Sequence, residues 1–365
     1  MADIRIQNLC KAFGDFVAVQ SSSFKIEDGE FFMLLGPSGC GKTTTLRMIA
    51  GLELPTSGEI FINDEEVGQK PASHRDIAFV FQMFALYPHM NVRKNISYPL
   101  ASQGMPRDQI KQKVAEVAGI LGIEDILDSP VSGLSGGDRQ RVALGRAIVR
   151  NPKCFLMDEP LGALDAEFRE HMAEELRALH DRMGATTVYV THDQLEAMQM
   201  GDKIVVMNHG VIEQFGTPQD IYDKPATMFV ADFVGSPSMN FLKFHGSVAP
   251  DATSVEFNHQ IFGVPALREA FTGDMVFGVR PEHVRLTDVA GYRAEIVASE
   301  YLGTTQIVSL KTHNGDVKAR VPSDRAVRVG DTVGLSFDVS TVTLFDNQSG
   351  RAIRSALNEG VLSDG

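Results

Sequence analysis

The chain has 365 residues, which is more than one ordinary domain, so we expect two domains. Hydrophobic residues make up 43% and charged residues 22%, as is typical of a globular protein with a sizeable core, and the net charge of −13 argues against non-specific nucleic-acid binding. No run approaches the roughly 18 apolar residues of a membrane-spanning helix, and no basic and then apolar leader begins the sequence. We therefore expect a cytoplasmic protein.

The first segments alternate apolar and polar residues. Ile4–Leu9, Phe16–Val19 and Ser23–Ile26 predict the strands of a small antiparallel sheet. Phe13, just before a turn at Gly14, has two possible roles: a stacking platform for a base, or part of the core.

A glycine-rich loop follows the next strand. The apolar run 31–35 leads into Gly36–Thr43, which has the P-loop spacing Gly-x4-Gly-Lys-Thr, and then into a helix that reaches Ala50. The backbone N–H groups of such a loop can surround a polyphosphate, while Lys42 adds a positive charge and Thr43 offers a hydroxyl to Mg²⁺. A chance glycine-rich turn is the alternative, but the strand before the loop and the helix after it favour a nucleotide site. The nucleotide-binding residues expected in this loop are Ser38, Gly39, Cys40, Gly41, Lys42, Thr43 and Thr44.

Two further strands end at polar groups of catalytic type. The apolar strand 154–157 is followed by Asp158 and Glu159, and the β-branched strand 186–191 by His192. Ligands bind at the carboxyl ends of strands in open α/β sheets, so Asp158 could hold the water shell of a metal and Glu159 could accept a proton from an attacking water. Taken singly, the two carboxylates could instead form a solvated turn, and the histidine could be structural.

Two segments between these strands point to partners or ligands. The buried strand 77–81 ends at Gln82, and the irregular loop 84–90 suits either core padding or a docking surface. Leu134–Asp138 is a second turn of small residues, and the helix after it carries several arginines. Its N-terminal N–H groups could face a ligand, or Ser135 could simply cap an ordinary helix.

The pattern changes after Gly235, where short strands separated by Gly, Asp, Asn and Pro turns predict a small all-β barrel or sandwich. Only Ala266–Phe271 looks helical. The expected strands are 241–248, 253–257, 276–279, 293–301, 306–311, 317–321, 332–337 and 342–345.

In this order the motifs resemble the ATP-binding subunit of an ATP-binding cassette (ABC) transporter, and the resemblance covers essentially the whole chain. The matching features are Phe13 (adenine-stacking aromatic), Gly36–Thr43 (Walker A), Gln82 (Q-loop), Leu134–Asp138 (signature), Phe155–Asp158 (Walker B), Glu159 (catalytic carboxylate), Leu161–Asp165 (D-loop) and His192 (switch histidine). The stretches 216–241 and 278–283 are similar to carbohydrate importers of the maltose and glycerol-phosphate type. Spermidine and ferric-ion importers, the alternative, share the layout but are less similar over residues 236–241.

The resemblance implies an α/β P-loop cassette over residues 1–235, with an N-terminal antiparallel β subdomain and a helical subdomain at about 88–150. An OB-like regulatory domain of the TOBE type would follow over 236–365. The chain would hydrolyse ATP to power import of a carbohydrate, polyol or glycerol-phosphate-like solute.

The same resemblance implies a paired site with ATP and Mg²⁺. Two cassettes would face head to tail, with each ATP between one P-loop and the Ser135, Gly136, Gly137 and Asp138 of the other cassette. Thr43, Gln82 and, through water, Asp158 would hold the Mg²⁺, and Glu159, His192 and Lys42 would be catalytic. The loop Gln82–Met90 would dock on two membrane-spanning permease subunits at the cytoplasmic face of the membrane, a solute-binding protein would act indirectly, and no nucleic acid is expected.

Two residues depart from the family pattern. Asp138 stands where Gln is usual, and Gly162 stands where Ser or Asn is usual. Both positions face the second cassette in the family arrangement. We therefore give about equal weight to two arrangements: a pair with a paralogous ATPase, and a pair of identical chains.

Overall fold

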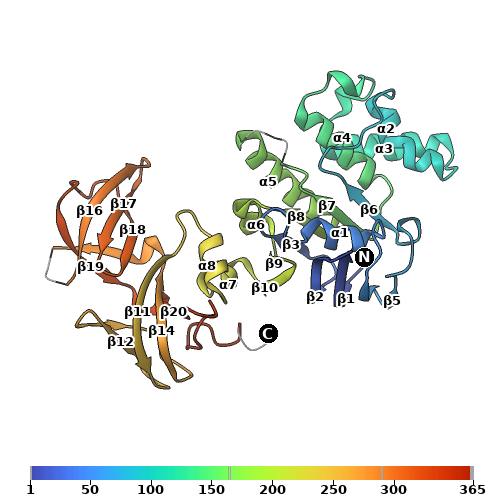
Figure 1. Ribbon diagram of the computed structural model, residues 1–365. Helices are drawn as coiled ribbons and strands as arrows, with labels where there is room; N and C mark the ends of the chain where they lie inside the picture. The colour runs from blue at the N-terminus through green and yellow to red at the C-terminus, as the bar shows by residue number, and fades with distance from the viewer. Residues whose placement is uncertain (1, 163, 165, 289–290, 362–365) are drawn as a thin grey trace. The chain divides into compact units, whose positions relative to one another are not determined.

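The computed structural model describes residues 2–162, 164, 166–288 and 291–361 (Figure 1). Contacts between residues divide the chain into two compact units, Met1–Pro218 and Gln219–Gly365. None of the helices formed by the described residues combines the length and the apolar character needed to cross a membrane.

A six-stranded sheet is the centre of the first unit, and its order is β10-β9-β3-β8-β7-β6. Every neighbouring pair is parallel except β10 and β9, which form an antiparallel hairpin. The strands are β3 (Phe31–Leu35), β6 (Ile77–Val80), β7 (Cys154–Asp158), β8 (Thr186–Thr191), β9 (Lys203–Asn208) and β10 (Val211–Gly216). All residues of β3, β7 and β8 are buried, which explains why these strands appear in the sequence as short, largely apolar runs rather than alternating ones.

A four-stranded antiparallel sheet precedes it in the chain, as the sequence predicted. Its order is β2-β1-β4-β5, formed by β1 (Ile4–Phe13), β2 (Phe16–Ile26), β4 (Ser57–Ile62) and β5 (Glu65–Glu66). The two strands expected over 16–26 form one continuous strand, because the polar stretch between them stays paired to β1 through register shifts, with Ser21 in a left-handed conformation (φ 44°).

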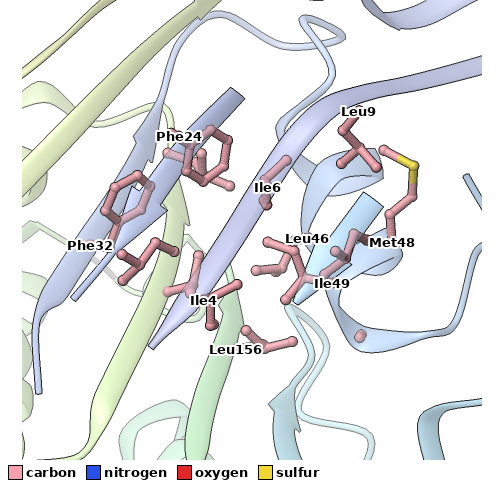
Figure 2. Packing of buried hydrophobic residues seen from close by; sticks show 14 of the residues in the cluster. Ile4, Ile6, Leu9, Phe24, Phe32, Leu46, Met48, Ile49 and Leu156 are labelled. Carbon is pink, nitrogen blue, oxygen red and sulfur yellow. The ribbon is translucent and has the colours of Figure 1, made fainter. Parts of the chain in front are cut away.

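The helix α1 (Lys42–Ala50) packs between this sheet and the central one (Figure 2). Leu46 and Ile49 lie among Ile4 and Ile6 of β1 and Leu156 of β7. All five side chains are at most 1% exposed. Burial of one such side chain contributes about 1.5–3 kcal/mol, so the apolar face of α1 fixes the position of the loop from which the helix begins.

The helical segment contains α2 (Val92–Ser102), α3 (Arg107–Leu121) and α4 (Gly136–Ile148). The sequence indicated α3 and α4 but not α2, which has Pro99 inside it. The helices α5 (Ala166–Met183) and α6 (Gln194–Met200) complete the first unit.

The second unit is mainly β, as predicted, and an aromatic-rich core joins its sheets. A three-stranded sheet has the order β11-β14-β20, a five-stranded sheet has the order β15-β19-β16-β17-β18, and β12 pairs with β13. The strands are β11 (Asn240–Val248), β12 (Ser254–Phe257), β13 (Gln260–Gly263), β14 (Phe271–Val279), β15 (Val284–Thr287), β16 (Tyr292–Tyr301), β17 (Thr305–Thr312), β18 (Gly315–Pro322), β19 (Thr332–Phe337) and β20 (Thr343–Asp346).

The helix predicted over Ala266–Phe271 is absent, and this prediction was wrong. Leu267 donates its N–H to Ala252 O at 3.0 Å, and Arg268 donates its N–H to Arg354 O at 2.8 Å. These bonds to distant segments take the place of bonds along a helix, and Phe271 already begins β14.

Two short helices, α7 (Pro218–Asp223) and α8 (Met228–Phe233), are tied to the β strands by Arg280. The Arg280 guanidinium is buried and donates to the carbonyls of Ala231 (2.9 Å), Tyr222 (2.8 Å) and Val234. Its carbon also lies 4.2 Å from the centre of the Tyr222 ring. The contacts thus group these helices with the second unit, whereas the sequence pattern placed the start of the β domain after residue 235.

Candidate functional site

Polar side chains gather at the carboxyl ends of four strands of the central sheet, because parallel neighbours end at the same edge. Lys42 and Thr43 come from the loop after β3, Gln82 follows β6, Asp158 and Glu159 end β7, and His192 follows β8. Hydrogen bonds and one close His192–Glu159 contact, described below, connect residues from all four positions.

The loop after β3 passes very close to its neighbours and needs glycine. Gly41 has a left-handed backbone (φ 105°), and a Cβ there would lie 2.5 Å from the Ala18 carbonyl of β2. Gly41 also begins α1, and no side chain of the described residues caps this helix end. The first amides of a helix lack partners within the helix, so this uncapped end can donate to an anion.

Lys42 is almost fully buried, at 4% exposure. Its ammonium donates to the carbonyls of Gly36 and Pro37, both at 2.8 Å, and it pairs with no carboxylate in the described part of the chain. Two of its three protons go to these carbonyls, and Cys40 Sγ lies 3.7 Å away. None of these groups neutralises its charge, so the cation is available to a phosphate. Ser38 and Gly39 are exposed at the tip of this loop, whereas Cys40 is buried.

Thr43 donates its hydroxyl to a carboxylate oxygen of Asp158 at 2.8 Å. Burial raises the pKa of Asp158, and the hydrogen bond from Thr43 opposes that shift. These oxygens are of the type that Mg²⁺ prefers, and Mg²⁺ commonly takes few protein ligands together with phosphate oxygens. No cluster of three His, Cys, Asp or Glu side chains able to hold a metal occurs among the described residues, so an ion here would also draw on the Gln82 amide and on phosphate.

Glu159 is the centre of a second group of contacts. Its carboxylate accepts a hydrogen bond from Gln82 Nε2 at 3.2 Å and lies 3.3 Å from His192 Nδ1. Its backbone is left-handed (φ 44°), and its N–H donates to Val190 O at 3.0 Å. Such a conformation costs about 1–3 kcal/mol in a residue other than glycine and is concentrated at functional sites.

The signature turn forms a separate feature at the start of α4. Ser135 caps the helix by accepting the Asp138 N–H at 3.2 Å, and its hydroxyl donates to Asp138 Oδ2 at 2.7 Å. Gly136 is exposed, whereas Gly137 is buried so closely beneath Phe168 that a Cβ would overlap the ring. No hydrogen bond or ion pair joins this turn to the P-loop among the described residues.

Of two other predicted features, Phe13 stays apart from the cluster and the D-loop adjoins it. Phe13 is 48% exposed near the β1–β2 turn, with the Lys11 ammonium 4.8 Å from the centre of its ring. In the D-loop, Gly162 donates its N–H to Glu159 O at 3.1 Å, but Ala163 and Asp165 lie outside the described residues.

The sequence did not reveal what holds the loop after Gln82. Phe84 and Ala85 both have left-handed backbones, and Arg146 of α4 donates to their carbonyls at 2.9 and 2.6 Å. Asn95 of α2 accepts the Tyr87 N–H at 2.8 Å. The arginines along the helix were visible in the sequence, but nothing in their spacing identified these carbonyls as partners.

Comparison with family models gives three matches. Residues 19–162 match the ABC transporter model, residues 235–284 the MalK OB fold domain and residues 277–345 the TOBE domain. The predicted P-loop cassette followed by an OB-like β domain is therefore confirmed.

Curated relatives align over nearly the whole chain. The trehalose/maltose import ATP-binding protein MalK of Thermococcus litoralis is 46% identical over 97% of this chain and 100% of its own length. The xylose/arabinose import ATP-binding protein XacK of Haloferax volcanii is 44% identical over 97% and 96%. The sn-glycerol-3-phosphate import ATP-binding protein UgpC of Ruegeria pomeroyi is 43% identical over 97% and 99%.

Solved structures agree with this assignment. A dimeric bacterial ABC transporter cassette superposes with a TM-score of 0.54 and 32% identity, over 59% of this chain and 98% of its own. The same cassette in a dimeric post-hydrolysis state with ADP and phosphate gives a TM-score of 0.53 and 31% identity, over the same shares. The P-loop, the carboxylates after β7 and these similarities lead to one conclusion: the chain belongs to the family of ABC transporter ATP-binding proteins and is an ABC transporter ATPase.

Proposed function

We propose that this ATPase powers the import of a carbohydrate, polyol or glycerol-phosphate-like solute. The relatives named above import trehalose, maltose, xylose, arabinose or glycerol phosphate, which supports this class of solute. A spermidine or ferric-ion importer is the alternative. The observation that carries the catalytic part is the contact of Glu159 with both Gln82 and His192 beside the Thr43–Asp158 pair.

The P-loop binds the phosphates of ATP. The uncapped amides of α1 donate to phosphate oxygens, and Lys42 leaves one or both carbonyls to pair with them. Thr43 and Gln82 hold Mg²⁺ directly and Asp158 holds it through water. The ion supplies positive charge to the phosphate oxygens when it is bound.

Glu159 orients the attacking water and accepts its proton, since its carboxylate is fixed on one side by Gln82 and on the other by His192. His192 bonds to the γ-phosphate in the closed site, and Lys42 stabilises charge on the transferring group. Phe13 stacks on the adenine from an exposed position.

The second half of each site comes from another cassette. Ser135, Gly136, Gly137 and Asp138 contact ATP bound to the partner, and the partner is either an identical chain or a paralogue. The dimeric cassettes among the solved structures support this arrangement.

The loop Gln82–Met90 docks on the permease subunits. Met83 is 81% exposed, and a groove of about 610 Å³ beside it is lined by Phe81, Tyr87 and Tyr98. Arg146 holds the backbone of the loop in place, which makes the groove a stable surface for a membrane-embedded partner. The protein then acts at the cytoplasmic face of the membrane, where a solute-binding protein reaches it only through the permeases.

The test is the Glu159→Gln variant in the transporter purified with its permeases and reconstituted in vesicles. We expect at least a hundredfold loss of ATP hydrolysis, since a general base typically contributes that much, with ATP still bound. Glu167→Gln, an exposed carboxylate at the start of α5, is the matched control and should hydrolyse ATP normally. Unchanged turnover in Glu159→Gln would refute the catalytic assignment, and uptake of none of the three solute classes would refute the proposed transport.

A further inference from the structure

The Asp138 carboxylate accepts a hydrogen bond from the only proton of the Ser135 hydroxyl. Ser135 Oγ donates to Asp138 Oδ2 at 2.7 Å while it accepts the Asp138 N–H at 3.2 Å. A serine hydroxyl has one proton to donate. While the Asp138 carboxylate accepts it, Ser135 has no proton for a phosphate oxygen.

The same carboxylate has a second partner in Arg141. Arg141 Nη1 lies 3.6 Å from Asp138 Oδ1, one turn further along α4. Arg141 also binds Glu175 of α5 through Nε and Nη2 at 3.2–3.3 Å, and His171 Nε2 lies 3.1 Å from Glu175 Oε1. The guanidinium is therefore shared between two carboxylates and compensates only part of the charge on Asp138.

We propose that Asp138 lowers the ATP affinity of the site that this turn completes, and that Arg141 limits the loss by compensating part of the carboxylate's negative charge. The proposal rests on the proposed role of the turn as the second half of an ATP site. Two physical effects act together. The carboxylate competes with the γ-phosphate for the Ser135 proton, and its negative charge lies beside a polyphosphate.

Helix capping alone does not require a carboxylate at this position. Asp138 is the third residue of α4 after the Ser135 cap, and this position of a capping box also accepts Gln. A neutral amide there keeps the cap, competes less strongly than a carboxylate for the Ser135 proton, and can itself donate a hydrogen bond. A purely structural role and a role in ATP affinity can therefore be separated by substitution.

The experiment measures ATP hydrolysis against ATP concentration in the purified transporter, for Asp138→Gln, Asp138→Asn and Asp138→Glu. Gln and Asn should lower the half-saturating ATP concentration about tenfold, the size expected of one partly screened charge near a phosphate, with little change in melting temperature. Asp138→Glu keeps the charge and should not lower the half-saturating ATP concentration. An unchanged or higher half-saturating concentration in both neutral variants would overturn the proposal. A similarly lowered half-saturating ATP concentration in Asp138→Glu would also overturn it.

A double-mutant cycle with Arg141→Met tests the second part. In the protein with Asp138, loss of Arg141 should raise the half-saturating ATP concentration several-fold. In Asp138→Gln the same loss should change little, because no carboxylate charge remains to be compensated. Equal effects in the two backgrounds would refute the role of Arg141. Lys42→Ala distinguishes these failures from a failure of the proposed function, since normal ATP turnover in that variant would mean that the P-loop is not the site.

Discussion

At the scale of single residues, packing rather than backbone conformation determines why Gly137 is a glycine. Its backbone is not left-handed, but a Cβ would overlap the Phe168 ring. Its neighbour Gly136 is exposed, and a Cβ there would lie 3.3 Å from the end of the flexible Leu164 side chain. The two glycines of one turn are therefore constrained to different degrees.

We expect Gly137→Ala to lower the free energy of unfolding by about 1–3 kcal/mol, because the ring must move away from the start of α4. Gly136→Ala is the matched control and should cost less than about 1 kcal/mol. Urea unfolding of the two variants measures the difference. Equal losses would show that the Phe168 contact does not determine the choice of glycine.

The residues of the site differ in how far the sequence could predict them. The P-loop glycines, Lys42, Glu159 and His192 follow strands in a fixed order, so their meeting at one sheet edge was predictable and the contacts among Glu159, Gln82 and His192 agree with it. The left-handed backbone of Glu159 and the Asp138–Arg141 pair were not predictable, because both depend on contacts rather than on spacing.

At the scale of an element, a buried arginine binds the carbonyl end of the helix that follows the P-loop. Arg75 is 2% exposed and donates to the carbonyls of Met48 (2.5 Å) and Ile49 (2.8 Å) near the end of α1. It also donates to Lys70 O and Gly68 O, at 2.9 and 3.0 Å. Burial lowers the pKa of Arg75 to about 10, so the guanidinium is still charged at neutral pH and complements the negative end of the helix dipole.

We expect Arg75→Met to lower the free energy of unfolding by about 2–4 kcal/mol, since it removes one donor from each of four carbonyls, of which Met48 O keeps the Gly51 N–H at 3.2 Å. Arg75→Lys keeps the charge but not the planar fork, so it should recover only part of the loss. Arg47→Met, at an exposed position of the same helix, serves as the control. Urea unfolding decides the matter, and a fully stable Arg75→Met would contradict the assignment.

Elements with one strong periodic pattern were predictable, and those governed by distant contacts were not. The strands β3 and β7 are short, mainly apolar runs and β8 is a β-branched run, and the structure has all three where the pattern predicted. The region 266–271 has a helical composition, but its backbone bonds to the strands and loops on either side. No helix was predicted over 92–102, where the structure has α2 with Pro99 inside it.

At the scale of the whole molecule, the second unit has a hydrophobic core of its own and includes α7 and α8 through Arg280. We expect a fragment of residues 219–365 to fold alone. A fragment of residues 236–365 should be less stable by about 3–5 kcal/mol, because Arg280 loses its three carbonyl acceptors and the β strands lose the packing of α7 and α8.

Urea unfolding measures the free energy of unfolding of the two fragments. Arg280→Met, made in both fragments, is the control. The substitution should destabilise the longer fragment and have little effect on the shorter one, where the acceptors are already absent. Equal stability of the unsubstituted fragments would instead support residue 235 as the physical boundary, which is where the family model for the OB fold begins.

The two carbonyls that hold the Lys42 ammonium also have a consequence for the end of the catalytic cycle. A buried cation left bare by a departing product would cost several kcal/mol, and that cost would slow the release of ADP and phosphate. Gly36 and Pro37 give the ammonium a resting position inside its own loop. Capture of a new nucleotide then exchanges one set of acceptors for another, so the loop can empty and refill without passing through an unpaired charge.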